Sequence, residues 1–477
     1  MTTPDPGAAS PSSHWSLATY ACGLAAAAVV AWYVAHIPVQ VSDSLGNLLA
    51  VRGSTYGHIF TSQMTTMRPL LWIQIKLAYE LAGGHYWLMF KAIHTLQLLA
   101  MACLVVRLLR VRSCLDAAVV PLVMAVVFGL HTFSGTVREA HPINAFLTIV
   151  VCVLAALNLS TLRPRLLVDV AAAGLLVFAA LTIESGLLVG VAFVAGRVAG
   201  LKGVSRGGVM ACLVLVAAYF VLRLGATGNG LPGLVGRATG FGLRTLESPE
   251  LVTRFGARPL VLYAYNVLAS VMTVLFSEPR AGVFLLPKGW IEQHEVPAWL
   301  AVDIGTSLLT TLVCAAWGMQ ALRRWRAGLT THADRVAAVA CALIGANACI
   351  SYGYTKDVIM SPGGVCFALV VYAAVRSLAE PPQAPAGGRL AVAALVGCLA
   401  VGWAVRAAAL PVLLTETAFK TRNDWATVYP ALRRQRIDVI TAGDTALVET
   451  LRGQALRMPV PHPRRPMPDY FAYFDLQ

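Results

Sequence analysis

Apolar segments about as long as a bilayer is thick recur along most of this chain, separated by short polar stretches. A membrane-spanning helix needs about 20 apolar residues, because it rises about 1.5 Å per residue through a hydrocarbon core about 30 Å thick. The composition agrees, since 57% of the residues are hydrophobic and only 13% are charged. Charged residues make up about twice that fraction in an ordinary soluble domain. The sequence therefore predicts an all-α polytopic membrane protein.

The predicted spans follow the positions of these segments. They are 16–38, 85–107, 116–133, 143–161, 166–183, 185–200, 207–224, 297–321, 334–352, 362–378 and 389–414. We expect about eleven spans in all, each near the length that a bilayer requires. The segment 259–277 is a further candidate. Either it does not cross fully, or it crosses and one later candidate does not.

Basic residues in the short loops orient these spans, because Lys and Arg concentrate on the cytoplasmic side. They are Arg107, Arg110, Arg112, Arg163, Arg165, Lys202, Arg206, Arg323, Arg324, Arg326 and Arg335. With these loops inside, the N-terminus is cytoplasmic and Asp43 faces the periplasm or exterior. We expect an integral protein of a bacterial inner membrane.

The predicted spans and their orientation divide the chain into three parts. Residues 1–15 form a disordered cytoplasmic N-terminus, 16–414 a transmembrane domain, and 415–477 a polar extracytoplasmic tail that packs on the outer loops. The two long outer loops, at 40–84 and 225–296, are expected to carry amphipathic helices.

Several common kinds of site have no signature in this sequence. All ten cysteines lie within or beside apolar segments, which is typical of small core residues and not of a disulfide framework. The chain has no glycine-rich phosphate loop, no His-Glu-x-x-His zinc pair and no nucleophile elbow. We therefore expect no required cofactor and no nucleic-acid partner. Any chemistry must use an already activated donor.

Ionisable residues gather at the predicted outer ends of the spans. Such groups are costly at membrane depth, so they tend to face a cavity and act there. Asp43 follows the first span and Arg68 lies shortly downstream, which places a base and a phosphate clamp side by side. The residues that we predict to meet are Asp43, Arg52, Arg68, His131, Arg138, Glu184, Tyr354 and Lys356.

Each of these residues also has a structural interpretation. Outer-loop charges such as Arg138 are most often simply solvated. Two further ionisable residues, His94 and Arg223, lie inside apolar segments and are equally well explained as satisfied core groups.

Short motifs within about residues 16–370 resemble those of a known enzyme family. They are Met67-Arg68-Pro69-Leu70-Leu71-Trp72, Gly83-Gly84-His85-Tyr86-Trp87, Ile93-His94-Thr95-Leu96-Gln97-Leu98-Leu99, Phe128-Gly129-Leu130-His131, Ile183-Glu184-Ser185-Gly186, the stretch from Arg254 to Phe276, and the stretch from Tyr354 to Pro362. This set resembles the GT-C integral-membrane glycosyltransferases. Among these it is most similar to the tetratricopeptide-associated O-mannosyltransferases and their bacterial relatives.

The resemblance implies a GT-C-like fold and transfer of a hexosyl or pentosyl group from a polyprenyl-phosphate-linked donor. The acceptor would be a hydroxyl of a protein or glycan, deprotonated by Asp43 so that it attacks the anomeric carbon with inversion. Cations stabilise a phosphate leaving group. That role would fall to Arg68 and Lys356, with His131 and Arg138 behind them.

The remaining predicted residues have orienting roles in this hypothesis. Glu184, Arg52 and Tyr354 would orient the sugar or the cations. No metal-ligand spacing is present, so metal independence is expected, although Asp43 with Glu184 could hold a divalent ion.

Three other functions are also compatible with the sequence. A transporter or flippase for a lipid-linked saccharide would use the same cationic cavity without a base. A polymerase or ligase would place its arginines in the long outer loop, at Arg244, Arg254 and Arg258. A non-enzymatic scaffold is the third.

Overall fold

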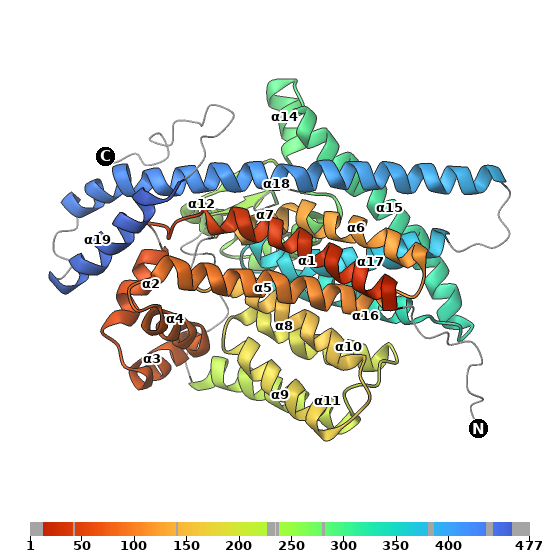
Figure 1. Cartoon of the computed structure of the whole chain (residues 1–477), viewed down its shortest axis with the longest axis horizontal. Coiled ribbons are helices and arrows are strands. Elements are labelled where there is room, and N and C mark those ends of the chain that lie inside the picture. The colour runs from red at the N-terminus through yellow and green to blue at the C-terminus, as the bar shows by residue number, and fades with distance from the viewer. Residues whose placement is uncertain are drawn as a thin grey trace.

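A computed structural model describes residues 13–41, 43–139, 142–226, 234, 238–278, 282–379, 386–435 and 442–459. Most of these residues are helical, and many of the long helices run roughly parallel to the long axis of the molecule (Figure 1). Of the predicted N-terminal segment 1–15, residues 1–12 lie outside the described residues, and the first helix begins at Ser13.

The elements are, in chain order, α1 (Ser13–Ala35), α2 (Asp43–Arg52), α3 (Tyr56–Gln63), η1 (Met64–Thr66), α4 (Pro69–Ala82), α5 (Tyr86–Leu109), α6 (Cys114–Gly129), α7 (His131–Arg138), α8 (Ala145–Ser160), α9 (Leu166–Ala180), η2 (Glu184–Leu187), α10 (Leu188–Val198), α11 (Arg206–Val221), η3 (Leu222–Ala226), β1 (Thr239–Phe241), β2 (Arg244–Leu246), α12 (Ser248–Phe255), α13 (Pro259–Leu275), α14 (Leu285–Gln293), α15 (Ala298–Arg326), α16 (His332–Ile350), η5 (Asp357–Met360), α17 (Ser361–Ala379), α18 (Ala386–Gln435) and α19 (Ala442–Arg457). The two strands pair antiparallel in a short hairpin. This hairpin and α12 lie in the long loop predicted at 225–296.

The protein is a mostly helical, polytopic membrane protein. Seven helices within the described residues are long and apolar enough to cross a membrane, or up to nine if each bent pair is one span. One bent pair joins α12 to α13 at 119°, which leaves a broken span or a re-entrant loop for the region predicted at 259–277. The other joins α6 to α7 at 63°.

Some predicted spans are shorter in the structure. The segment predicted at 185–200 divides into η2 and the 11-residue α10. The helices α8 and α9 are apolar, at 16 and 15 residues. All ten cysteines are free thiols.

The main hydrophobic core is built around α17. Every residue from Ser361 to Val375 in this helix is buried, so it is apolar on all sides and packs against several neighbours. Its neighbours include α16, α6 and α15. A helix enclosed in this way fixes the positions of the helix ends around it.

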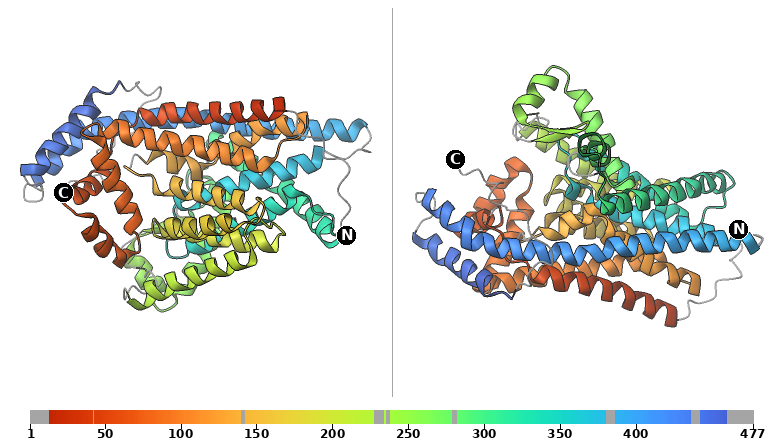
Figure 2. Two further views of the ribbon diagram at one scale, coloured as in Figure 1. Left: turned by 60° about the horizontal axis from the view of Figure 1, so that its bottom comes forward. Right: turned by 90° about the horizontal axis from the view of Figure 1, so that it is seen from above.

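A second core, which we call the cap, lies at one end of the bundle and contains α2, α3, α4, α19 and the last turns of α18 (Figures 1 and 2). Trp425 of α18 is fully buried there, and its indole N–H donates to the carbonyl oxygen of Val39 at 2.7 Å. The amide of Gln454 in α19 donates to the carbonyl oxygen of Gly84 at 2.8 Å. The cap therefore joins the start of the chain to its last described helix.

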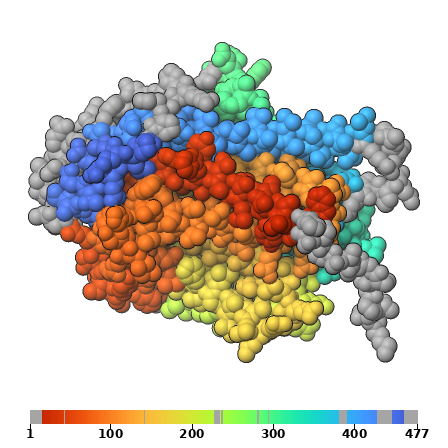
Figure 3. Space-filling model, viewed as in Figure 1, coloured from red at the N-terminus to blue at the C-terminus, as the bar shows by residue number. Residues whose placement is uncertain are grey.

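The boundary predicted at residue 414 does not coincide with a break. Helix α18 has 50 residues and runs past this point to Gln435, crossing the whole visible face of the molecule (Figure 3). At about 1.5 Å per residue it is about 75 Å long, more than twice the thickness of a hydrocarbon core. The helix continues because Trp425 gives its polar end a buried face in the cap.

Trp425→Ala is expected to destabilise the protein by about 3–5 kcal/mol, because it removes a fully buried indole and leaves a cavity in the cap. Thermal unfolding of the purified protein in detergent measures the change. Trp299→Ala is the matched control, since Trp299 is 59% exposed, and it should change stability by less than about 0.5 kcal/mol. Equal effects of the two substitutions would contradict the proposed packing of the cap.

Candidate functional site

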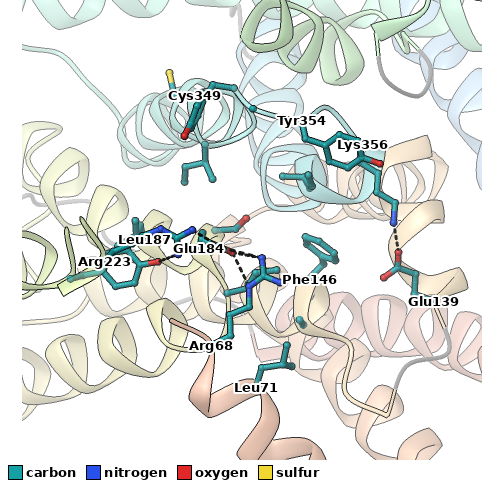
Figure 4. Close-up of a pocket in the computed structure, with 18 of the residues that line it drawn as sticks. Arg68, Leu71, Glu139, Phe146, Glu184, Leu187, Arg223, Cys349, Tyr354 and Lys356 are labelled. Carbon is teal, nitrogen blue, oxygen red and sulfur yellow. Dashed lines mark hydrogen bonds and ion pairs between the residues drawn. The ribbon is translucent and has the colours of Figure 1, made fainter. Parts of the chain in front are cut away.

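A cavity of about 1190 Å³ opens where the cap meets the helix bundle (Figure 4). Its walls are the ends of helices and the turns that follow them. The polar side chains that line it are Asp43, Asn47, Arg68, Glu139, Glu184, Ser185, Tyr219, Arg223, Tyr352, Tyr354 and Lys356. The cavity is larger than a typical small-molecule pocket of about 300–1,000 Å³, so it has room for more than one reactant group.

Asp43 contributes an exposed carboxylate to this cavity. It is the first residue of α2, where the helix dipole stabilises a negative charge. The next residues, Ser44 and Leu45, are buried and hold the first turn in place. Among the described residues, no group forms a hydrogen bond or ion pair with the Asp43 carboxylate. The carboxylate is thus held by its backbone and is accessible to a substrate.

Arg68 and Glu184 form a bidentate ion pair on the cavity wall. Arg68 Nη2 donates to Glu184 Oε2 at 2.8 Å and to Oε1 at 3.1 Å, and Nε donates to Oε2 at 3.2 Å. The Arg68 side chain remains 36% exposed. Its Nη1 makes no hydrogen bond within the described part of the chain, so this group can donate to a ligand oxygen.

Arg223 is a second arginine on the same carboxylate. Its Nη2 donates to Glu184 Oε1 at 3.2 Å, and its Nη1 donates to the hydroxyl of Tyr219 at 3.3 Å. Two guanidinium groups on one carboxylate leave one net positive charge on this wall. Sequence reasoning assigned Arg223 equally to the core, although it lies at the end of an apolar run, in the π-helical turn η3. Such turns are frequent at functional sites.

The backbone around Arg68 is fixed by the turn that carries Glu184. Met67, just before Arg68, is fully buried and has a φ of 56°, which is uncommon for a residue other than glycine. The amide N–H of Leu70 donates to the carbonyl oxygen of Leu181 at 3.0 Å, and Gln74 Nε2 donates to Thr182 Oγ1 at 3.1 Å. These bonds hold the start of α4 against the end of α9.

The close approach of η2 to α9 depends on Gly186. A Cβ atom at this position would lie 2.0 Å from the carbonyl oxygen of Ala179. Only glycine fits such a contact, because the neighbouring atom is backbone and cannot rotate away. Gly186 therefore fixes the position of Glu184 two residues earlier.

Lys356 and Tyr354 lie on another wall of the cavity, in the segment that follows α16. Lys356 Nζ forms an ion pair with Glu139 Oε1 at 3.1 Å and is 48% exposed. This segment is held by Asn266, whose side-chain amide donates to the carbonyl oxygen of Tyr352 at 2.9 Å. Figure 4 shows the Lys356–Glu139 pair apart from the arginine pair.

The structure brings five predicted residues to the cavity, namely Asp43, Arg68, Glu184, Tyr354 and Lys356. The other three predicted residues do not line it. His131 lies 3.9 Å from Asp357, because the bend between α6 and α7 turns its ring into the bundle. Arg138 donates to the hydroxyl of Thr417 on α18 at 3.2 Å. Arg52 is in the last turn of α2, where it complements the helix dipole.

A buried arginine that the sequence analysis did not select supports the wall near His131. Arg406 of α18 is 5% exposed, and it donates to the carbonyl oxygen of Gly129 at 3.2 Å, where α6 ends. It also pairs with Asp303 at 3.3 Å and donates to Ser277 at 2.9 Å. The sequence feature that could have identified Arg406 is its position within an apolar segment, where a charged residue is costly unless it has a role. Arg406 satisfies a broken helix end that would otherwise be unpaired.

Two of the acidic residues that line the cavity, Glu139 and Glu184, form ion pairs with cations. Glu184 accepts hydrogen bonds from two arginines, which makes it a poor ligand for a divalent ion. Within the described ranges, no group of three or more His, Cys, Asp or Glu side chains is arranged to hold a metal.

Comparisons of the chain with protein-family models, curated proteins and solved structures found no match. The resemblance to the GT-C enzymes therefore stays a prediction from short motifs.

Gly186→Ala is expected to displace η2, because the added methyl group cannot share space with the carbonyl oxygen of Ala179. We expect a loss of about 1–3 kcal/mol or more in the free energy of unfolding, measured by thermal or chemical denaturation. Gly174→Ala is the control, since a Cβ at Gly174 meets no atom within 4 Å. A Gly186→Ala protein as stable as the control would contradict this account of the turn.

Proposed function

We propose that the chain is a membrane glycosyltransferase with a GT-C-like arrangement, which moves a sugar from a polyprenyl-phosphate-linked donor to an acceptor hydroxyl. The observation that carries the proposal is the meeting in one cavity of a two-arginine wall with the Asp43 carboxylate, which has no ion-pair partner among the described residues. Such a cavity offers a base for one reactant and a cationic site for the other.

Asp43 suits the role of general base. Inverting transfer requires a group that removes the proton of the acceptor hydroxyl as the oxygen attacks the anomeric carbon. The carboxylate accepts this proton, the new glycosidic bond forms, and the bond between the sugar and the lipid phosphate breaks. Because Asp43 is exposed and makes no ion pair within the described residues, its lone pairs are accessible to the acceptor.

Arg68 and Arg223 suit stabilisation of the leaving phosphate. The bond that breaks leaves its electron pair on a phosphate oxygen, and positive groups aimed at that oxygen lower the barrier. Glu184 holds both guanidinium groups on the wall, and one net positive charge remains for the phosphate. Arginine is favoured over lysine here, because a guanidinium group can bind Glu184 through Nε and Nη2 and still donate to a phosphate oxygen through Nη1.

An apolar wall beside the arginines suits the lipid part of the donor. Leu187, Phe220 and Leu224 line the cavity near Arg223. Phe220 and Leu224 are also 44% and 51% exposed, so this wall continues onto the outer surface of the bundle. A polyprenyl chain can lie along this surface in the bilayer while its phosphate enters the cavity.

In this proposal the cavity faces the periplasm or exterior of a bacterial inner membrane. The support is the positive-inside rule, because the basic short loops lie at the opposite ends of the helices that reach the cavity. The acceptor, a protein or a glycan, would then enter from the aqueous side.

Two alternatives differ from the proposal in measurable ways. A flippase would use the cavity without release of lipid phosphate and without dependence on Asp43. A polymerase or ligase with its arginines in the long loop is less favoured, because Arg244 and Arg254 both pair with Glu250, at 3.0 and 2.7 Å. Neither of these arginines lines the cavity.

Asp43→Asn is expected to lower the rate of sugar transfer about 10²- to 10⁴-fold, the usual contribution of a positioned general base. Transfer and release of lipid phosphate are measured in membranes supplied with polyprenyl-phosphate sugar. Donor binding should persist, since the arginine wall is unchanged. Glu292→Gln, on the exposed helix α14, is the control and should retain activity. If Asp43→Asn transfers sugar at the rate of the unmodified protein, Asp43 is not the general base.

Arg68→Ala is expected to raise the KM for the lipid-linked donor about 10- to 100-fold, as the loss of a charged hydrogen bond predicts. The KM for the acceptor should change little, and Arg68→Lys should recover only part of the loss. Arg254→Ala, a change on the long loop, is the control. If donor and acceptor KM values rise equally, Arg68 has a structural role and not a role in phosphate binding.

A further inference from the structure

A basic cluster lies at the end of the bundle away from the cavity. We define it as Arg107, Arg110, Arg112, His332 and Arg335, which come from the α5–α6 turn and the first residues of α16. Arg110, Arg112 and Arg335 all act electrostatically on the imidazole of His332. The backbone groups that hold Arg110 and Arg335 lie in two turns that contact each other, because the amide N–H of Gly203 donates to the carbonyl oxygen of Ser160 at 2.9 Å, beside Thr161. The positive groups of two separate turns therefore lie at the same end of the bundle.

The cluster is separated from the cavity by the length of a helix. His332 begins α16, and Ile350, the last residue of α16, lines the cavity. Nineteen residues of helix span about 28 Å. Figure 1 shows α5 and α16 running between these two ends of the bundle. A ligand at the cluster would therefore lie near the opposite face of the membrane.

The acids nearest in sequence are occupied by other groups. Asp116 pairs with Arg376 at 3.1 Å and caps the start of α6, where it accepts from the backbone of Ser113. Asp334 pairs with Arg324 at 2.6 Å and caps α16 in the same way. Asp116 Oδ2 also accepts from the backbone N–H of Arg112 at 2.9 Å. Among the residues that the structure describes, no carboxylate forms an ion pair with an arginine side chain of the cluster. Within the described ranges, the guanidinium groups of the cluster thus lack a carboxylate partner.

Backbone geometry fixes two of the arginines. Arg110 has a φ of 47°, which is uncommon for a residue other than glycine, and its Nη2 donates to the carbonyl oxygen of Thr161 at 3.2 Å. Arg335 Nη1 donates to the carbonyl oxygen of Gly200 at 3.2 Å. The Nε2 atom of His332 is buried and has no hydrogen-bond partner within the described ranges. The hydrogen bonds to Thr161 and Gly200 hold Arg110 and Arg335 in fixed positions, unlike mobile surface side chains.

Exposed apolar residues flank the cluster. Leu162, next to Thr161, is 37% exposed, and Leu329 is 70% exposed on the turn before α16. A site with cations beside exposed apolar groups matches a lipid headgroup and its chains better than a soluble anion.

We propose that the basic cluster binds the phosphate group of an anionic phospholipid in the leaflet opposite the cavity. Its arginines donate to the phosphate oxygens, and the flanking leucines contact the upper part of the acyl chains. The bound phosphate offsets part of the positive charge of the cluster and ties the α5–α6 turn to the start of α16. This inference does not depend on the proposed glycosyltransferase activity.

The test uses the full-length protein, stripped of lipid and returned to nanodiscs of phosphatidylcholine with increasing phosphatidylglycerol. Retained lipid is counted by native mass spectrometry, and the unfolding midpoint is measured at each composition. In Arg110→Gln/Arg112→Gln the apparent affinity for phosphatidylglycerol should fall about tenfold or more, at about 1 kcal/mol per basic residue. The matched control, Arg323→Gln/Arg326→Gln, removes equal charge from the end of α15 but no member of the cluster. It should lose only the general attraction to an anionic surface, and so its affinity should fall at least about threefold less than that of Arg110→Gln/Arg112→Gln, which also loses charged hydrogen bonds to the phosphate.

Two results would overturn the proposal. Equal loss in both double variants would show general attraction to a charged surface. Stabilisation by inorganic phosphate alone, equal to that by phosphatidylglycerol, would show a site for soluble phosphate. Arg110→Lys/Arg112→Lys should keep most of the affinity, and an unchanged unfolding midpoint of the Gln variant in pure phosphatidylcholine shows that it is folded.

Discussion

The carboxylate of Glu184, shared between Arg68 and Arg223, is the interaction on which the cavity depends. It joins three separate parts of the chain: the turn before α4, the turn η2, and the end of α11. In a poorly solvated site an ionised group is costly unless it is paired and hydrogen-bonded. Loss of Glu184 would leave two neighbouring guanidinium groups without their shared carboxylate, so the cavity wall depends on this one side chain.

Other helix ends around the cavity are satisfied in a similar way. Arg406 caps the break between α6 and α7, and Asn266 binds the backbone that follows α16. Polar groups at interrupted helices cannot be left unpaired within a membrane, so each break needs a partner from another helix. The breaks supply the irregular backbone that lines a cavity, and their partners make it rigid. This is the arrangement that the proposed transfer reaction requires, with the base and the cationic wall held in place before the substrates arrive.

Only some residues of the cavity can be predicted from the sequence, for a physical reason. Asp43, Arg68, Glu184 and Lys356 were selected because they are ionisable groups beside apolar segments, where solvation by lipid is unfavourable. His131 and Arg138 met the same criterion, but the bend after α6 directs them toward other helices. The sequence does not distinguish whether Arg223 is a core group or a functional residue. The direction of a side chain at a helix end depends on the packing of that helix.

The sequence by itself determined the helical, membrane-spanning character of the protein, because this property depends on the composition of consecutive residues. It also marked most of the ionisable groups that line the cavity. Only the tertiary structure decided which of them meet, because Arg68 and Glu184 are 116 residues apart and Arg223 joins them from a third element. It likewise decided that α18 continues past residue 414, since the buried face at Trp425 exists only when the cap is assembled. Contacts between distant segments depend on how helices pack, and local sequence does not encode that packing in a form that can be read residue by residue.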